Sequence, residues 1–206
     1  MDIEPLSIAK LPKMAEIWQN TLNWQPTNFQ ENQFQQLYQL IIAGNRQINL
    51  TRITEPEEFW EKHLWDSLRG IAPKQIFIPG IDRGKKIIDI GTGAGFPGLP
   101  IALIFPSSQV TLLDSTGKKI TFIETVLSAL AVKNAKTLLG RAEEIGQQYE
   151  HRQNYDVAVI RAVGNVSVCA EYSLPLVKKG GLAIIYRGNW SEAENESLET
   201  AVEQLG

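Results

Sequence analysis

One stretch, IIDIGTGAGFPGLP at residues 87–100, constrains the fold of this chain more than any other. A strand-like apolar run leads there directly into Gly91, Gly93, Gly95 and Gly98. Because glycine lacks Cβ and tolerates positive φ, such a cluster lets the backbone turn sharply and approach a ligand closely. The pattern favours a nucleotide or a nucleotide-like cofactor as that ligand.

Short β-branched runs alternate with helical stretches from Lys86 onward. The runs that favour strands are KIIDI, QVTLLD, KTLLG, YDVAVIR and GLAIIYR. This alternation predicts a mostly parallel, doubly wound, Rossmann-like α/β sheet with helices on both faces. Ligands of such sheets bind at the carboxyl ends of the strands, so the cofactor is expected over Gly91–Gly95.

The first 85 residues contain no convincing alternating strand and predict a helical extension. Two apolar sets recur at helical spacing, Phe34, Leu37, Tyr38, Ile41 and Ile42 in one and Trp60, Leu64, Leu68 and Ile71 in the other. Thr54, followed by Pro56 and Glu57, is the predicted start of the second helix. The predicted division is a helical N-terminal extension over 1–85 and a core domain over 86–206, with the boundary near Pro79, Gly80 and Gly84.

Composition narrows the class of protein. The 206 residues are 43% hydrophobic and 21% charged, and no apolar run approaches the roughly 18 residues of a membrane span. The N-terminal MDIEPLSIAKL lacks the features of a signal peptide, and the single Cys169 offers neither an internal disulfide nor metal-ligand spacing. We therefore expect a cytoplasmic protein with no membrane contact and no metal. The net charge of −3 counts against an RNA partner without excluding one, since a local positive patch suffices.

The glycine spacing selects the type of cofactor. A dinucleotide fingerprint needs a third glycine where this chain has Phe96, whereas the glycines follow D-x-G-x-G-x-G from Asp89. That pattern is similar to the first motif of class I S-adenosylmethionine-dependent methyltransferases. Asp114 ends the strand TLLD roughly 20 residues later, where an acid can accept hydrogen bonds from ribose hydroxyls. The alternative is an α/β protein with a merely tight first turn.

Longer matches, from about Asn49 to Gly188, make the resemblance closer. They are INLTRI, HLWDSL, DIGTGAGFPGLPIAL, TLLDSTGKKITFIE, GRAEE and YDVAVIRAV. Together these segments resemble the RsmG (GidB) family of bacterial methyltransferases, which act on N7 of guanine 527 in 16S ribosomal RNA. The resemblance implies S-adenosylmethionine as cofactor, and small-subunit ribosomal RNA or its assembly intermediate as partner of a monomeric enzyme.

The resemblance also implies roles for individual residues. Those expected to bind the cofactor are Gly91, Gly93, Phe96, Asp114, Ser115, Thr116, Ala142, Glu143 and Arg161. Asp114, Ser115 and Thr116 would surround the ribose, Ala142 and Glu143 would lie near the adenine, and Arg161 would face the reactive end as the catalytic candidate. The chain departs from the family by carrying Arg187 where relatives commonly have lysine. It also stops at Gly206, so the antiparallel hairpin that closes the family's seven-stranded sheet is expected to be missing.

Basic residues are predicted at or beyond the strand ends that surround the cofactor. Lys118, Lys119, Arg141 and Arg187 are the RNA-binding candidates, and the alternative is a set of solvated surface charges. Arg161 follows the apolar run VAVI, which aims it at the site, although a structural ion pair with a carboxylate such as Asp89 is the competing interpretation.

Three further residues have a structural interpretation that we favour over a functional one. His63 and Asp66 are three residues apart and predict a pair on a helix surface that stabilises its own turn. Cys169 has apolar neighbours and is expected to be a buried structural cysteine. Phe96 could stack on a ligand ring, but an aromatic beside a glycine turn commonly serves packing.

The chemistry favoured by the sequence is methyl transfer to guanine N7. The chain has no NPPY-like motif after the fourth strand to hold an exocyclic amine and no well-placed cysteine for attack on a pyrimidine. The N7 lone pair needs neither, because it can attack a sulfonium methyl directly. Two alternatives stay open: a class I methyltransferase with a small-molecule or protein substrate, and a non-enzymatic cofactor-binding module.

Overall fold

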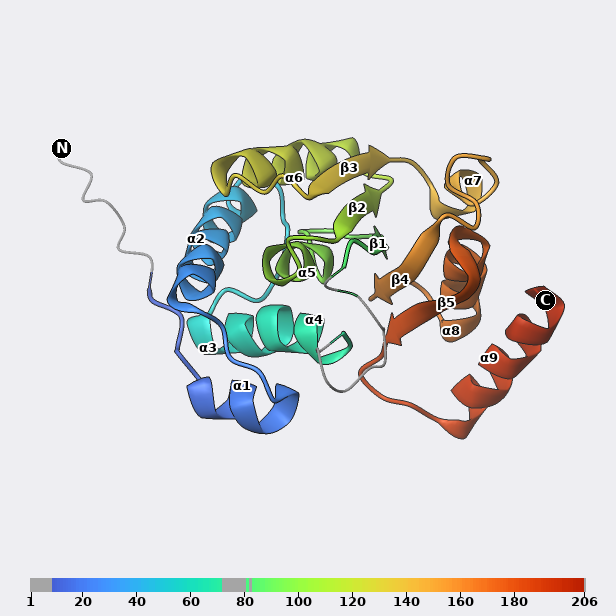
Figure 1. The fold of residues 1–206 in the computed structure, drawn as a ribbon, viewed down its shortest axis with the longest axis horizontal. Helices are drawn as coiled ribbons and strands as arrows, with labels where there is room; N and C mark the ends of the chain where they lie inside the picture. The colour runs from blue at the N-terminus through green and yellow to red at the C-terminus, as the bar shows by residue number, and fades with distance from the viewer. Residues whose placement is uncertain (1–8, 72–80, 82, 206) are drawn as a thin grey trace.

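A parallel sheet forms the centre of the molecule (Figure 1). The computed structural model describes residues 9–71, 81 and 83–205. The five strands lie in the order β3-β2-β1-β4-β5, and every neighbouring pair is parallel. Their bounds are β1 Lys86–Ile90, β2 Gln109–Asp114, β3 Ala135–Leu139, β4 Tyr155–Arg161 and β5 Val177–Tyr186. The predicted α/β class is confirmed, and the order reverses between β1 and β4, which places the switch point at their carboxyl ends.

Side chains alternate between the two faces of the sheet, as the period of two along a strand requires. Ile87 and Val157 belong to one apolar cluster, whereas Ile88 and Ala158 belong to the other. Helices pack on both faces: α5 (Gly98–Ile104) and α6 (Gly117–Ala129) against the first cluster, and α7 (Ala142–Ile145) and α8 (Val166–Ser173) against the second. The 3-10 turn η2 (Leu174–Leu176) leads into β5, and α9 (Glu192–Leu205) packs against α8.

The regular elements in the described part of the chain before Lys86 are all helical, as predicted. They are α1 (Ala15–Leu22), α2 (Asn28–Asn45), α3 (Pro56–Phe59), a π-helical turn η1 (Trp60–Trp65) and α4 (Asp66–Arg69). A capping box between Thr27 and Gln30 starts α2. Both predicted apolar sets are buried except for Ile42, which is half-buried. The predicted helix start at Thr54 is one residue early, because Glu55 is the N-cap and Pro56 the first helical residue.

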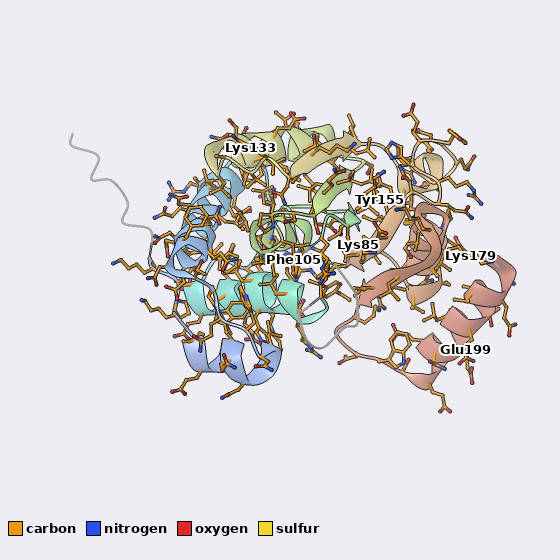
Figure 2. All side chains as sticks on the ribbon, viewed as in Figure 1. Lys85, Phe105, Lys133, Tyr155, Lys179 and Glu199 are labelled. Atoms are coloured by element: carbon orange, nitrogen blue, oxygen red, sulfur yellow. The ribbon has the colours of Figure 1, made fainter. Side chains whose placement is uncertain are left out.

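The N-terminal helices share one apolar cluster with the sheet. Trp18, Phe59 and Leu64 lie in the same cluster as Val159 of β4. Figure 2 shows Phe105, which follows α5, in the interior between these layers, and Glu199 on α9 at the outside. The division into 1–85 and 86–206 stays a prediction, and its boundary residues at 72–80 lie outside the described residues.

The described residues contain neither a membrane-spanning helix nor a metal-binding group of side chains. No helix among them is both long and apolar enough to cross a bilayer. No group of three or more His, Cys, Asp or Glu in residues 9–71, 81 and 83–205 is arranged to hold a metal ion. The sheet that these residues form has five strands, β3-β2-β1-β4-β5.

Candidate cofactor and acceptor site

The glycine loop is held by the carboxylate at the end of the neighbouring strand. Gly91, Gly93 and Gly95 have φ of +67°, +60° and +99°, the left-handed region that glycine adopts without steric cost. The Gly93 N–H donates to Asp114 Oδ2 at 2.9 Å, and the Thr116 N–H donates to Oδ1 at 2.8 Å. Asp114 is only 6% exposed. One acid therefore fixes both the loop after β1 and the turn after β2.

A pocket of about 310 Å³ lies at the carboxyl ends of the strands beside this loop. Six predicted cofactor residues line it, namely Gly91, Asp114, Ser115, Thr116, Ala142 and Glu143. Gly93 is not in its wall and is joined to it through the hydrogen bond to Asp114. The structure thus brings together residues that are more than 50 positions apart in the sequence.

These residues fit the nucleoside part of S-adenosylmethionine. Each Asp114 oxygen accepts one backbone N–H, and a carboxylate oxygen can accept two donors, so capacity for ribose hydroxyls is left. A Cβ built on Gly91 would lie 2.7 Å from Val163 Cγ2, which shows that only glycine fits between the loop and the segment after β4. Lys119 Nζ lies 3.8 Å from Asp114 Oδ2 and offsets its charge.

Asp89, the first residue of the motif, fastens the other end of the loop. Its Oδ2 accepts from Thr92 Oγ1 at 2.6 Å and from the Gly98 N–H at 2.8 Å, so it fixes the start of α5. Its Oδ1 has no hydrogen-bond partner among the described residues. Complete burial raises the pKa of Asp89 to about 6. The sequence identifies Asp89 as the start of the glycine pattern and as a possible partner of Arg161, but it does not predict this role in holding the loop.

Phe96 does not line the cofactor pocket. Its ring is buried and stacks on His63, with centroids 4.3 Å apart and planes 7° from parallel, and it meets Phe59 edge-on at 5.6 Å. Stacked and edge-to-face ring pairs each stabilise a fold by about 0.5–1.5 kcal/mol beyond the burial of their area. The packing alternative therefore describes Phe96 better than the predicted cofactor contact.

Arg161 takes part in an ion pair, but its partner is Asp66 and not Asp89. Nη1 donates to Asp66 Oδ2 at 3.0 Å and to the Lys62 carbonyl at 2.7 Å, and the side chain is 16% exposed. Arg161 lies outside the wall of the cofactor pocket and lines a second pocket beside it. Its predicted catalytic role stays a prediction.

The predicted surface pair between His63 and Asp66 is wrong. His63 is buried, and its Nε2 lies 2.8 Å from Thr51 Oγ1, while Arg161 Nη2 lies 3.4 Å from Nδ1. Burial, and then the Arg161 charge, lower the pKa of His63 to about 3. Helical spacing put His63 and Asp66 on one face, but only the fold brings Arg161 between them.

The four RNA-binding candidates lie near the carboxyl edge of the sheet and differ in exposure and in ion pairing. Lys118 is exposed and has no ion pair in the described part of the chain. Arg141 donates through Nε to Glu143 at 2.6 Å, and Arg187 donates through Nη2 to Glu194 at 2.6 Å. Lys119 is half-buried and pairs with Asp114 at 3.8 Å. Three of the four charges are therefore already paired within the described part of the protein, and Lys118 is the exception.

Cys169 is a buried structural cysteine, as predicted. Its Sγ donates to the Val163 carbonyl at 2.7 Å, and burial raises the pKa of the thiol. A neutral thiol is a poor nucleophile, which agrees with the absence of a role for Cys169 in methyl transfer.

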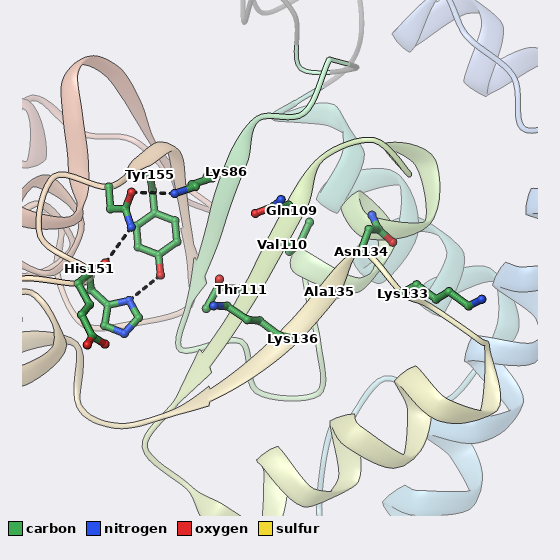
Figure 3. Close-up of a pocket in the computed structure, with 12 residues that line it drawn as sticks. Lys86, Gln109, Val110, Thr111, Lys133, Asn134, Ala135, Lys136, His151 and Tyr155 are labelled. Atoms are coloured by element: carbon green, nitrogen blue, oxygen red, sulfur yellow. Dashed lines mark hydrogen bonds between the residues drawn. The ribbon is translucent and has the colours of Figure 1, made fainter.

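A further pocket of about 370 Å³ opens near the amino ends of the strands (Figure 3). Lys86 and Thr111 line it together with Tyr155, whose hydroxyl lies 2.9 Å from His151 Nδ1. It lies at the end of the sheet opposite to the glycine loop. Because open α/β sheets bind ligands at the carboxyl ends, the pocket beside Asp114 is the candidate cofactor site.

The strand order, the glycine loop after β1 and the acid at the end of β2 define a class I S-adenosylmethionine-dependent methyltransferase. The family model described as "rRNA small subunit methyltransferase G" (GidB) matches residues 30–206. The chain belongs to this family, as the sequence resemblance predicted.

Curated relatives agree along nearly the whole chain. "Ribosomal RNA small subunit methyltransferase G" of a Nostoc species is 68% identical over 196 residues, covering 95% of this chain and 80% of the relative. The protein of that name from Microcystis aeruginosa is 54% identical over 197 residues, covering 95% of this chain and 88% of the relative.

Solved structures support the fold alone. A protein from Corynebacterium glutamicum superposes with a TM-score of 0.55 at 12% identity, covering 92% of this chain and 85% of that one. TYW2 of P. horikoshii in complex with MeSAdo gives a TM-score of 0.50 at 14% identity, covering 64% of this chain and 54% of that one.

Proposed function

We propose that this protein transfers a methyl group from S-adenosylmethionine to N7 of a guanine in 16S ribosomal RNA. The observation that carries the proposal is the glycine loop held by Asp114, in a chain whose curated relatives are ribosomal RNA small subunit methyltransferases G. Within the family resemblance, the target is guanine 527.

In this proposal most of the site residues bind the cofactor, and Arg161 lies near the acceptor. Bound S-adenosylmethionine supplies an electrophilic methyl group on its sulfonium. Asp114 accepts from the ribose, Gly91 allows close approach of the backbone, and Ala142 with Glu143 borders the adenine. Arg161, at the end of β4, is held by Asp66 on the side of the pocket where the acceptor enters.

The proposed acceptor, guanine N7, needs no general base. Among the described residues, the walls of the cofactor pocket and of the pocket beside it contain no cysteine that could attack a pyrimidine. Guanine N7 carries a free lone pair, so alignment with the methyl group and electrostatic stabilisation suffice. An amine or a pyrimidine carbon would need a proton acceptor or a covalent nucleophile.

N7 lies on the major-groove edge of guanine, which A-form RNA hides in a deep, narrow groove. The target is therefore an exposed loop nucleotide or one turned out of the stack. Lys118, which is exposed and has no ion pair among the described residues, is the RNA-contact candidate best supported by its surroundings, whereas Lys119 already pairs with Asp114. The monomeric, cytoplasmic state expected from the sequence is part of this proposal.

The test is to incubate the protein with cofactor labelled in the methyl group and with small-subunit particles or naked 16S RNA that lack the modification. Label is expected in one guanosine, and mapping identifies it. With 7-deazaguanosine at that position, transfer should vanish while RNA binding persists within a few-fold. Continued methylation of the 7-deaza nucleotide contradicts N7 as acceptor, and label in a small molecule or a protein instead of RNA contradicts the substrate.

A further inference from the structure

We infer that the pocket beside the cofactor site receives the target guanine, and that Asp66 recognises its N1–H and 2-amino group. The inference rests on the proposed function and adds a specificity residue to it. The pocket, of about 370 Å³, lies between the helical N-terminal part and the carboxyl ends of β4 and β5. It is of the size that small-ligand pockets have.

The two pockets are neighbours. Ala162 lines both, and Arg161 precedes it at the end of β4. A base in the second pocket can therefore reach the cofactor across Ala162. Tyr186 borders the pocket and is fixed by donating its hydroxyl proton to the Ser67 carbonyl at 2.7 Å.

Asp66 is a pre-positioned acceptor in this wall. Arg161 Nη1 holds Oδ2 at 3.0 Å, while no donor in the described part of the chain reaches Oδ1, and the side chain is 34% exposed. An ionised carboxylate only accepts hydrogen bonds. It can pair with the N1–H and 2-amino donors of guanine, whereas N1 of adenine is an acceptor that it would repel.

The other carboxylate in the pocket suits this role less well. Glu61 Oε1 already accepts from Lys62 Nζ at 2.8 Å, and its side chain is 53% exposed. An exposed pair of this kind is mobile and screened by water. Asp66 is held by a largely buried arginine, so it presents its free oxygen in a fixed direction.

The orientation also agrees with the chemistry. N7 and the N1–H/2-amino donors lie on opposite edges of the purine, so a guanine bound to Asp66 directs N7 away from the carboxylate and toward Ala162. Methylation at N7 makes the base cationic. A carboxylate on the far edge stabilises that positive charge as it develops, which is the property of a group complementary to the transition state.

The experiment replaces the target guanosine by inosine, which keeps N7 and N1–H but lacks the 2-amino group. Wild-type protein, Asp66→Asn, Glu61→Gln and the exposed control Glu58→Gln are compared by single-turnover methylation of both RNAs. Calorimetric affinity for S-adenosylmethionine should be unchanged in all variants and reports that each is folded.

We expect inosine to lower the wild-type rate roughly 10- to 100-fold, the cost of one hydrogen bond to a charged group. In Asp66→Asn the guanosine rate falls, and the inosine penalty shrinks to within about threefold, whereas Glu58→Gln retains the full penalty. A wild-type rate equal on both RNAs, an undiminished penalty in Asp66→Asn, or a penalty lost in Glu61→Gln instead overturns the assignment to Asp66. If no guanosine is methylated, the proposed function fails, and the assignment fails with it.

Discussion

The rings of His63 and Phe96 stack with their centroids 4.3 Å apart and their planes 7° from parallel. His63 belongs to η1 in the helical N-terminal part, and Phe96 follows the glycine loop. The stack therefore ties the glycine loop to the helices that carry Asp66. Arg161 extends this link, because it contacts both His63 and Asp66. The pocket beside the cofactor site is therefore lined by residues of both the helical N-terminal part and the sheet-containing part of the chain.

Because His63 is buried as a neutral ring, the stability of the protein should depend on pH. The folded-state pKa is lowered to about 3, below the ordinary value of 6.5, so the unfolded state binds the proton more readily. Stability is then lost as pH falls below about 6.5, and the loss is complete near pH 3. Between about pH 7 and about pH 5 the cost from this group is about 2 kcal/mol.

Asp89 acts in the opposite direction, because its folded-state pKa is raised to about 6 from 3.8. Comparison of wild type with His63→Gln isolates the histidine, since Asp89 is present in both. Urea unfolding at several pH values should show that the variant loses about 2 kcal/mol less than wild type between those limits. Parallel stability curves would mean that His63 titrates normally in the folded protein.

Gly93→Val should abolish binding of S-adenosylmethionine. A Cβ at Gly93 meets no protein atom closer than the Gly91 carbonyl oxygen at 3.8 Å, so a side chain there projects into space that we assign to the cofactor. Gly180→Val is the matched control, because Gly180 also has positive φ and its Cβ would have no atom within 4 Å. Calorimetry should find normal affinity in the control. Equal loss in both variants would attribute the effect to backbone strain.

Asp114→Ala should weaken cofactor binding by roughly 1.5–3 kcal/mol, the value of a hydrogen bond to a charged group. The substitution also releases the Gly93 N–H. Asp156→Ala is the control, since Asp156 accepts the Lys86 N–H at 2.8 Å near the amino end of the sheet. It should lower stability without changing the affinity. Wild-type affinity in Asp114→Ala would remove the assigned site.

The double variant Lys118→Ala/Lys119→Ala should lower the magnitude of the log–log salt slope of RNA binding by about 0.7, the value of one phosphate contact on single-stranded RNA, because Lys119 is already paired with Asp114. Arg187→Ala should change the slope less, because Glu194 already pairs with Arg187. The control is Lys133→Ala/Lys136→Ala, which removes two exposed lysines beside the pocket in Figure 3. A slope reduced equally by the control would place RNA at both ends of the sheet.

The sequence by itself determined the elements and the identity of the cofactor loop. Short β-branched runs and glycine spacing are local properties of the chain, so the five strands, the loop at Gly91–Gly95 and the acid at Asp114 could be predicted from them. Burial of the apolar sets around Leu37 and Leu64 followed from helical periodicity in the same way.

Only the tertiary structure decided the partners of the charged residues. Arg161 and Asp66 are 95 positions apart, and no local pattern states which carboxylate a buried arginine will meet. The choice of Asp66 over Asp89 depends on how the helices pack on the end of β4. The same packing buries His63 and turns Phe96 toward it. The folded state with both rings inside the apolar cluster has a lower free energy than one in which either ring is exposed to water.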